Sequence, residues 1–155
     1  MLFNDTMQQS VIAAIKNHWP NVVGIGLFGS VARGTTHENS DIDLLIVLQA
    51  NTQLTRRLYT YWDECVEPTL PSNPWSPHFV IEPTDSSSLG SIWLEFASEG
   101  KILSDDSSKL ATITEHIREL ITKGYYQKMK APGAPPYWRS INQKSETSVR
   151  RNGQS

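Results

Sequence analysis

The segment from Val22 to Leu48 constrains the fold more than any other part of the chain. It opens with an apolar run, Val22 to Phe28, which is rich in β-branched residues and has the length of a buried strand. Gly29 and Ser30 follow at once, where the chain must turn sharply and a residue without Cβ fits. After a polar stretch, Asp41 to Leu48 predicts a second buried strand. We therefore expect two strands of one sheet, joined by a tight turn and a short helix.

The two aspartates of the second predicted strand are the strongest chemical signal. Asp41 and Asp43 are two residues apart, and strand side chains alternate between faces, so both carboxylates point to the same side. Such a pair repels itself without a cation, and hard oxygen ligands suit Mg²⁺ or Mn²⁺. The Gly29-Ser30 turn, at the start of a helix, offers N–H groups and a hydroxyl to an anion. A metal site beside a phosphate cradle is the arrangement that nucleotidyl transfer requires.

These residues resemble a known signature. Gly29-Ser30, ten intervening residues and Asp41-Ile42-Asp43 are similar to the motif of the polymerase-β-like nucleotidyltransferase superfamily. The longer form, GSxARGxxxxxSDIDLLIV, resembles its smallest branch, the minimal nucleotidyltransferases (MNT), which includes the antitoxin partners of HEPN toxins. The resemblance implies two Mg²⁺ ions, ATP as substrate, and transfer of AMP to a hydroxyl such as a tyrosine of a HEPN-like partner.

Within the motif, the resemblance assigns a nucleotide-binding role to four residues. We expect Gly29 to let the backbone approach the phosphates and Ser30 to donate its hydroxyl and N–H. Arg33 is expected either to add charge near the β- and γ-phosphates or to lie on the surface. Ser40 is expected to brace the second strand beside the aspartates.

The third carboxylate of the superfamily is harder to place. The resemblance expects it on a neighbouring strand, here HFVIEP, whose middle residue is Val80 where the commonest form has an aspartate. Glu82 has the right charge and, by alternation, faces the same side as Val80. We therefore predict Asp41, Asp43 and Glu82 as the catalytic and metal-binding set. His78 as a substitute ligand, or no third ligand, are the alternatives.

The remaining pattern predicts a small α/β domain with a mixed sheet of three to five strands and helices mainly on one face. Residues 1–106 are expected to form the minimal nucleotidyltransferase domain and residues 107–130 a C-terminal helix, which either covers the sheet or contacts a partner. Residues 131–155 are proline-rich and polar, and we expect a flexible tail in which Tyr137-Trp138 docks onto the domain or a partner.

Composition narrows the class of protein. The net charge is −2, from 14 basic and 16 acidic side chains, which argues against a general nucleic-acid binder. The single cysteine fits a reducing compartment. We expect no signal peptide, because the first ten residues lack a basic region and a long apolar core, and no run of about twenty apolar residues predicts a membrane-spanning helix. A cytoplasmic protein without membrane contact is expected, and a homo-oligomer is compatible with the sequence.

Three functions fit these observations. The first is Mg²⁺-dependent transfer of AMP to a partner protein, as in an antitoxin. The second is an inactive nucleotide-binding module that acts by masking a partner. The third is an adenylyltransferase for a small molecule of the aminoglycoside type.

Overall fold

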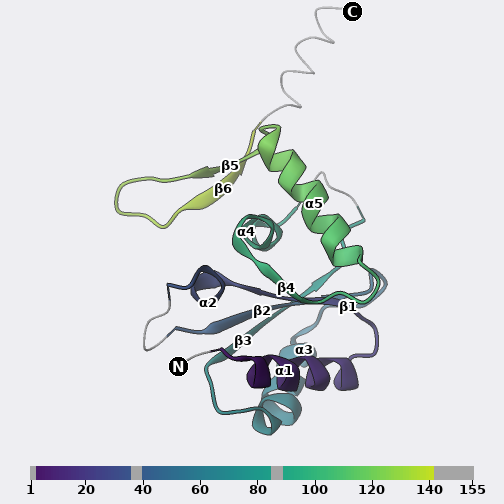
Figure 1. Cartoon of the computed structure of the whole chain (residues 1–155). Helices are drawn as coiled ribbons and strands as arrows, with labels where there is room; N and C mark the ends of the chain where they lie inside the picture. Colours follow the sequence, from purple (N-terminus) through teal and green to yellow (C-terminus); the bar gives the residue numbers. More distant parts are fainter. Residues whose placement is uncertain (1–2, 36–39, 85–88, 142–155) are drawn as a thin grey trace, which may run out of the picture.

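A computed structural model describes residues 3–35, 40–84 and 89–141. The chain forms a layered α/β domain with a hairpin projecting from one end (Figure 1). In chain order the elements are α1 (Asp5–His18), β1 (Val22–Phe28), α2 (Gly29–Arg33), β2 (Ile42–Leu48), α3 (Arg56–Tyr61), η1 (Trp62–Val66), η2 (Glu67–Thr69), β3 (Trp75–Ile81), α4 (Ser91–Glu99), β4 (Lys101–Ser104), α5 (Lys109–Thr122), β5 (Tyr126–Met129) and β6 (Tyr137–Ser140). None of the described helices has the length and apolarity of a membrane-spanning segment.

Four of the described strands form a mixed sheet in the order β3-β2-β1-β4. Strand β1 is antiparallel to both β2 and β4, whereas β2 and β3 are parallel. The two strands predicted around the Gly29-Ser30 turn are therefore neighbours, and the predicted fold class, a small α/β domain with a mixed sheet, is confirmed.

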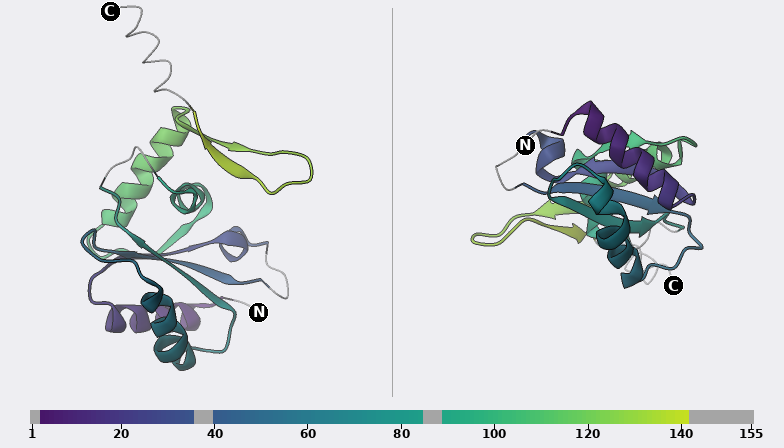
Figure 2. Two further views of the ribbon diagram at one scale, coloured as in Figure 1. Left: turned by 180° about the vertical axis from the view of Figure 1, so that it is seen from behind. Right: turned by 90° about the horizontal axis from the view of Figure 1, so that it is seen from below.

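Helices cover both faces of the sheet, whereas the sequence led us to expect them mainly on one face (Figures 1 and 2). Helix α1 and the α3 region pack on one face, around Leu44, Ile46 and Leu48 of β2. Helices α4 and α5 pack on the other face, around Leu45 and Val47. The physical reason is that β2 is apolar on both sides, so each side must be covered.

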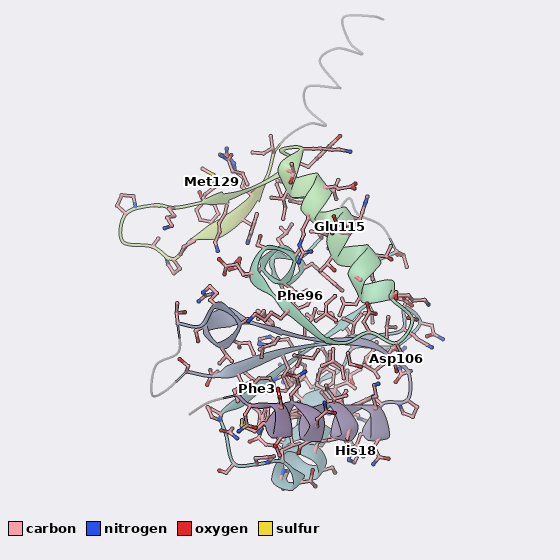
Figure 3. The ribbon with its side chains drawn as sticks, in the orientation of Figure 1. Phe3, His18, Phe96, Asp106, Glu115 and Met129 are labelled. Carbon is pink, nitrogen blue, oxygen red and sulfur yellow. The ribbon has the colours of Figure 1, made fainter. Side chains whose placement is uncertain are left out.

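Helix α4 packs closely on the sheet because Gly26 of β1 has no side chain. A Cβ on Gly26 of β1 would collide with the ring of Phe96. Phe96 points from α4 toward the sheet and is almost fully buried (Figure 3). This contact fixes α4 over the centre of the sheet.

Strand β3 is longer than predicted. It begins at Trp75 instead of His78 and includes Pro77, which is tolerated because β3 lies at the edge of the sheet. The backbone N–H of Phe79 donates to the hydroxyl of Tyr59, 3.1 Å away. The position of this strand decides which side chains stand beside the aspartates.

The C-terminal segment differs most from expectation. Helix α5 ends at Thr122, and Gly124 follows with φ +87°. The chain then forms an antiparallel hairpin in which Tyr126 pairs with Ser140 and Met129 with Tyr137. The first part of the predicted tail is thus ordered, because Trp138 anchors it to α4, and the rest of that tail, residues 142–155, lies outside the described residues.

Candidate functional site

The turn after β1 touches the second aspartate of the motif. Phe28 pairs with Asp43 across the sheet, so Gly29 begins α2 directly beside that carboxylate. Gly29 has φ +76°, and a Cβ there would collide with Oδ2 of Asp43. Glycine is therefore required twice, once for the backbone conformation and once for the close approach. The structure brings the predicted turn and the predicted carboxylate together.

Helix α2 is a short turn of helix that starts at this point. Phe28 is its N-cap, so Ser30 lies inside the first turn, one residue past the helix start. Gly34 ends the helix with φ +75°, and its N–H donates to the carbonyl of Val31. The N–H groups of Gly29 and Ser30 are among those at a helix start that lack partners within the helix.

The two aspartates lie at the open corner of the sheet. Asp41 is exposed and precedes β2, whereas Asp43 is partly buried within it. Alternation within β2 puts Asp43 on the side of Leu45 and Val47, which is the side of α4 and α5. Asp43 and the Gly29 turn therefore share one corner, and Asp41 lies one residue before the strand.

His78 stands beside Asp43 on the other flank. In the parallel register Asp43 lies opposite Ser76, and Leu45 lies opposite His78. Nε2 of His78 is 3.3 Å from Oδ1 of Asp43, and its ring meets that of Phe28 edge-on at 5.1 Å between centroids. An ionised carboxylate only accepts, so this contact places the proton on Nε2.

Glu82 lies at the far end of the same strand. Its N–H donates to the carbonyl of Leu48, and its carboxylate lies 3.9 Å from Nζ of Lys109. Asp43 and Leu48 are five positions apart along β2, which is roughly 16 Å along a strand. Glu82 is therefore not positioned to share an ion with the aspartates. Within the described part of the chain, no three His, Cys, Asp or Glu side chains form a metal-binding group.

The other predicted nucleotide-binding residues have protein partners. Nη1 of Arg33 is 3.0 Å from Oε2 of Glu99 at the end of α4, and both side chains are partly exposed. Ser40 is buried just before the aspartates, a position that fits its expected bracing role. The charge of Arg33, at the end of α2, is thus directed at least in part to Glu99 of α4.

A cavity of about 470 Å³ opens next to His78. Phe28 and His78 form its sheet side, Ile92 and Glu95 contribute from α4, and residues 136–138 of the hairpin close it. In the sequence, the aromatic pair Tyr137-Trp138 was the only indication that the hairpin residues have a role, and no pattern pointed to Glu95.

Glu95 holds the hairpin in place. Its carboxylate accepts hydrogen bonds from Nζ of Lys128, at 2.9 and 3.1 Å, and from the indole N–H of Trp138, at 2.7 Å. Burial works to raise the pKa of Glu95, but these hydrogen bonds outweigh it and hold that pKa below its ordinary value. The wall of the cavity is thus fixed by an ionised carboxylate.

The chain is similar to known nucleotidyltransferase and toxin–antitoxin proteins. Residues 9–82 match the nucleotidyltransferase domain family. A structure of a toxin–antitoxin with AMP-PNP is similar over 96% of this chain and 98% of that one, with 15% identity and a TM-score of 0.52. The MntA–HepT toxin–antitoxin gives 12% identity over 98% and 100% of the chains, with a TM-score of 0.54.

A tri-AMPylated Shewanella oneidensis HEPN toxin in complex with MNT antitoxin is similar over 97% of this chain and 98% of that one, with 13% identity and a TM-score of 0.53. At such identities the likeness concerns the fold. Comparison with curated proteins gave no significant match.

Proposed function

We propose that this chain, whose residues 9–82 match the model of the nucleotidyltransferase domain family, transfers AMP from ATP to a hydroxyl group on a partner protein. The observation that carries the proposal is the contact between Gly29 and Asp43, which joins a helix start and a carboxylate in one corner. The fold shared with toxin–antitoxin structures supports a protein partner, a HEPN-like toxin in the simplest case.

The two aspartates fit a magnesium site completed by substrate. Mg²⁺ in proteins is commonly held by one or two carboxylates together with phosphate oxygens, so Asp41 and Asp43 suffice as protein ligands. When bound, Mg²⁺ or Mn²⁺ would neutralise charge on the phosphates and on the leaving pyrophosphate. We assign no ligand role to Glu82, which faces Lys109 instead.

The chain's own residues then position the nucleotide. The N–H groups at Gly29 and Ser30, with the Ser30 hydroxyl, would bind the terminal phosphates, and Arg33 would add positive charge if it leaves Glu99. In the transfer, the acceptor oxygen forms a bond to the α-phosphorus while the bond from that phosphorus to the bridging oxygen breaks. Pyrophosphate leaves with the electron pair, and the hydroxyl proton passes to water.

Labelled ATP tests the proposal directly. The full chain is incubated with Mg²⁺, ATP labelled at the α-phosphate and the product of the neighbouring gene. We expect label on that protein, reduced at least about 100-fold in the double variant Asp41→Asn, Asp43→Asn, since metal ions supply several kcal/mol of charge stabilisation. Glu82→Gln is the matched carboxylate control, and its rate should stay within about twofold of the wild type. Transfer that survives in the double variant would refute the assignment.

A non-catalytic binding module is the second candidate, because the described residues lack a third carboxylate beside Asp43. Calorimetry with Mg²⁺ and a non-hydrolysable ATP analogue separates the two. Binding of the analogue together with no transfer to any partner would favour the module.

A further inference from the structure

The β5–β6 hairpin has two faces, and only one of them holds it to the domain. The other face, called the outer face below, consists of Tyr125, Gln127, Met129, Tyr137, Arg139 and Ile141. We propose that the outer face binds single-stranded RNA, with bases stacked on its exposed tyrosines and phosphates at its arginine. This inference goes beyond the proposed function and does not depend on it.

The inner face of the hairpin is occupied by its contact with α4. Lys128 lies opposite Trp138, and both side chains donate to the carboxylate of Glu95. Tyr126, two residues before Lys128, is buried in the apolar cluster of α4 and α5. The charge of Lys128 is thus paired within the domain, and this face is not available to a ligand.

The outer face follows from strand geometry. Successive residues of a strand point to opposite sides, and residues directly opposite each other in an antiparallel pair share a side. The pairs that alternate with the inner ones are Met129 with Tyr137 and Gln127 with Arg139. The N–H of Ile141 donates to the carbonyl of Tyr125, which adds a third pair. Since the hairpin projects from the domain (Figure 1), these side chains are directed away from α4.

Two tyrosine rings on the outer face are open to solvent. Tyr125 is 41% exposed and Tyr137 is 50% exposed, and the exposed Arg139 lies between them along the ribbon. At about 3.4 Å per residue the two rings are roughly 14 Å apart along the hairpin. Tyr137 also borders the cavity beside His78, so the row begins near that cavity. Rings and an arginine in one row are the groups on which the bases of a single strand stack.

The charge of this segment suits a polyanion. Residues 120–155 contain seven of the 14 basic side chains and one of the 16 acidic ones, so the net charge of −2 conceals a basic segment on an acidic domain. Residues 120–141 contain no acidic side chain. Lys130 and Arg139 are exposed, and within the described ranges neither forms an ion pair. The net charge that argues against nucleic acid for the whole chain therefore does not describe the hairpin.

The combination of rings and charge distinguishes RNA from other polyanions. An acidic peptide would neutralise Arg139 but has no row of flat bases for the tyrosines. A duplex keeps its bases stacked inside and would offer the rings nothing. Single-stranded RNA offers both groups, because its unpaired bases can be splayed out and stacked on aromatic side chains. We therefore expect the outer face to bind it more tightly than either alternative.

The test measures the fluorescence anisotropy of a labelled, unstructured RNA of about 12 nucleotides as the full chain is added. EDTA is present, so that no metal ion at the aspartates takes part. We expect saturable binding that weakens with salt and is at least about fivefold tighter than that of an RNA duplex or of polyglutamate. No saturable binding at low salt, equal or tighter binding of the duplex or polyglutamate, or tighter binding of the DNA strand of the same sequence would each overturn the assignment.

Substitutions test the two rings. Tyr125→Ala and Tyr137→Ala should each weaken RNA binding at least about fivefold, whereas the Phe variants should stay within about twofold, because stacking needs the ring and not the hydroxyl. Tyr61→Ala is the control, since Tyr61 is 40% exposed but lies on α3, across the sheet from the hairpin. An unshifted indole N–H resonance of Trp138 in the free variants shows that the hairpin is still docked. An equal loss in Tyr61→Ala, or in the Phe variants, would contradict stacking on the outer face.

A second pair of variants tests the charge. Arg139→Gln should weaken RNA binding and lower the slope of log K against log salt by about 0.7, the value for one phosphate of a single strand. Arg57→Gln removes the same charge from an exposed position on α3 and should leave the slope unchanged. Equal changes in the two variants would show that the RNA responds to net charge alone, and the assignment to the hairpin would fail.

Discussion

The two faces of the sheet are built differently. On the face of α1 and α3, buried apolar residues continue from Met7 and Ile15 of α1 through Leu44 and Ile46 to Trp62. On the face of α4 and α5, the apolar cluster stops at the corner where Asp43, His78 and Glu95 lie. The face of α1 and α3, called the closed face below, is filled with apolar side chains that hold the domain together. The face of α4 and α5, called the open face, leaves a corner of the sheet where polar groups and a cavity lie.

Strand β2 produces this difference by simple alternation. Leu44 and Ile46 point to the closed face, and Leu45 to the open one. Asp43 continues the open-face row at the start of the strand, next to Gly29. Strand β2 is apolar along most of its length and carries the carboxylate of Asp43 only near its start, where the covering helices no longer exclude water.

The largest expected effect is on the free energy of unfolding, and it tests whether the two faces of the sheet are packed differently. Ile46→Ala and Leu45→Ala each remove a fully buried side chain from adjacent positions of β2. Buried Leu or Ile to Ala changes cost about 2–5 kcal/mol, depending on how far the site can relax. We expect Ile46→Ala near the upper end and Leu45→Ala nearer the lower end, because Leu45 lies beside His78 at the open corner. Urea unfolding measures both, and a greater loss for Leu45→Ala would contradict the comparison.

A smaller effect concerns the turn at the open corner. Gly29→Ala adds a Cβ against Asp43 at a position with φ +76° and should lower AMP transfer at least about 50-fold. Gly34→Ala is the matched control, since Gly34 has φ +75° but nothing within 4 Å of an added Cβ. Transfer assays and unfolding curves on both variants separate backbone strain, which they share, from the collision. Equal activity losses would show that the contact with Asp43 is unimportant.

The smallest effect is the pH dependence of the cavity wall. The pKa of Glu95 is lower in the folded chain than in the unfolded one, so its ionised form stabilises the fold above the ordinary pKa of 4.5. This contribution is lost as the pH falls below that value, and we expect at most about 1 kcal/mol because the pair is partly exposed and screened by water. Unfolding free energies from about pH 6 to about pH 3, compared with Glu95→Gln, measure it. An unchanged difference across this range would contradict the role of the charge.

Much of the corner of the sheet around Gly29 and Asp43 could be predicted from short stretches of sequence. The turn at Gly29, the alternation that places Asp43 on the open face and the pairing of the two flanking strands depend on residues close in the sequence. The sequence analysis chose Glu82 over His78, whereas the structure places His78 beside Asp43, because the register between β2 and β3 is set by where β3 begins, at Trp75. Strand alternation alone fits either residue equally well.

The amino-acid sequence by itself determined the motif and the α/β character of the chain, because steric limits on glycine and the two-residue period of a strand act locally. Only the tertiary structure decided that helices cover both faces, that Glu82 faces Lys109, and that the hairpin closes a cavity beside His78. The bond between Trp138 and Glu95 joins residues 43 positions apart. Contacts over such separations form only when the packed core brings their elements together, so no local pattern predicts them.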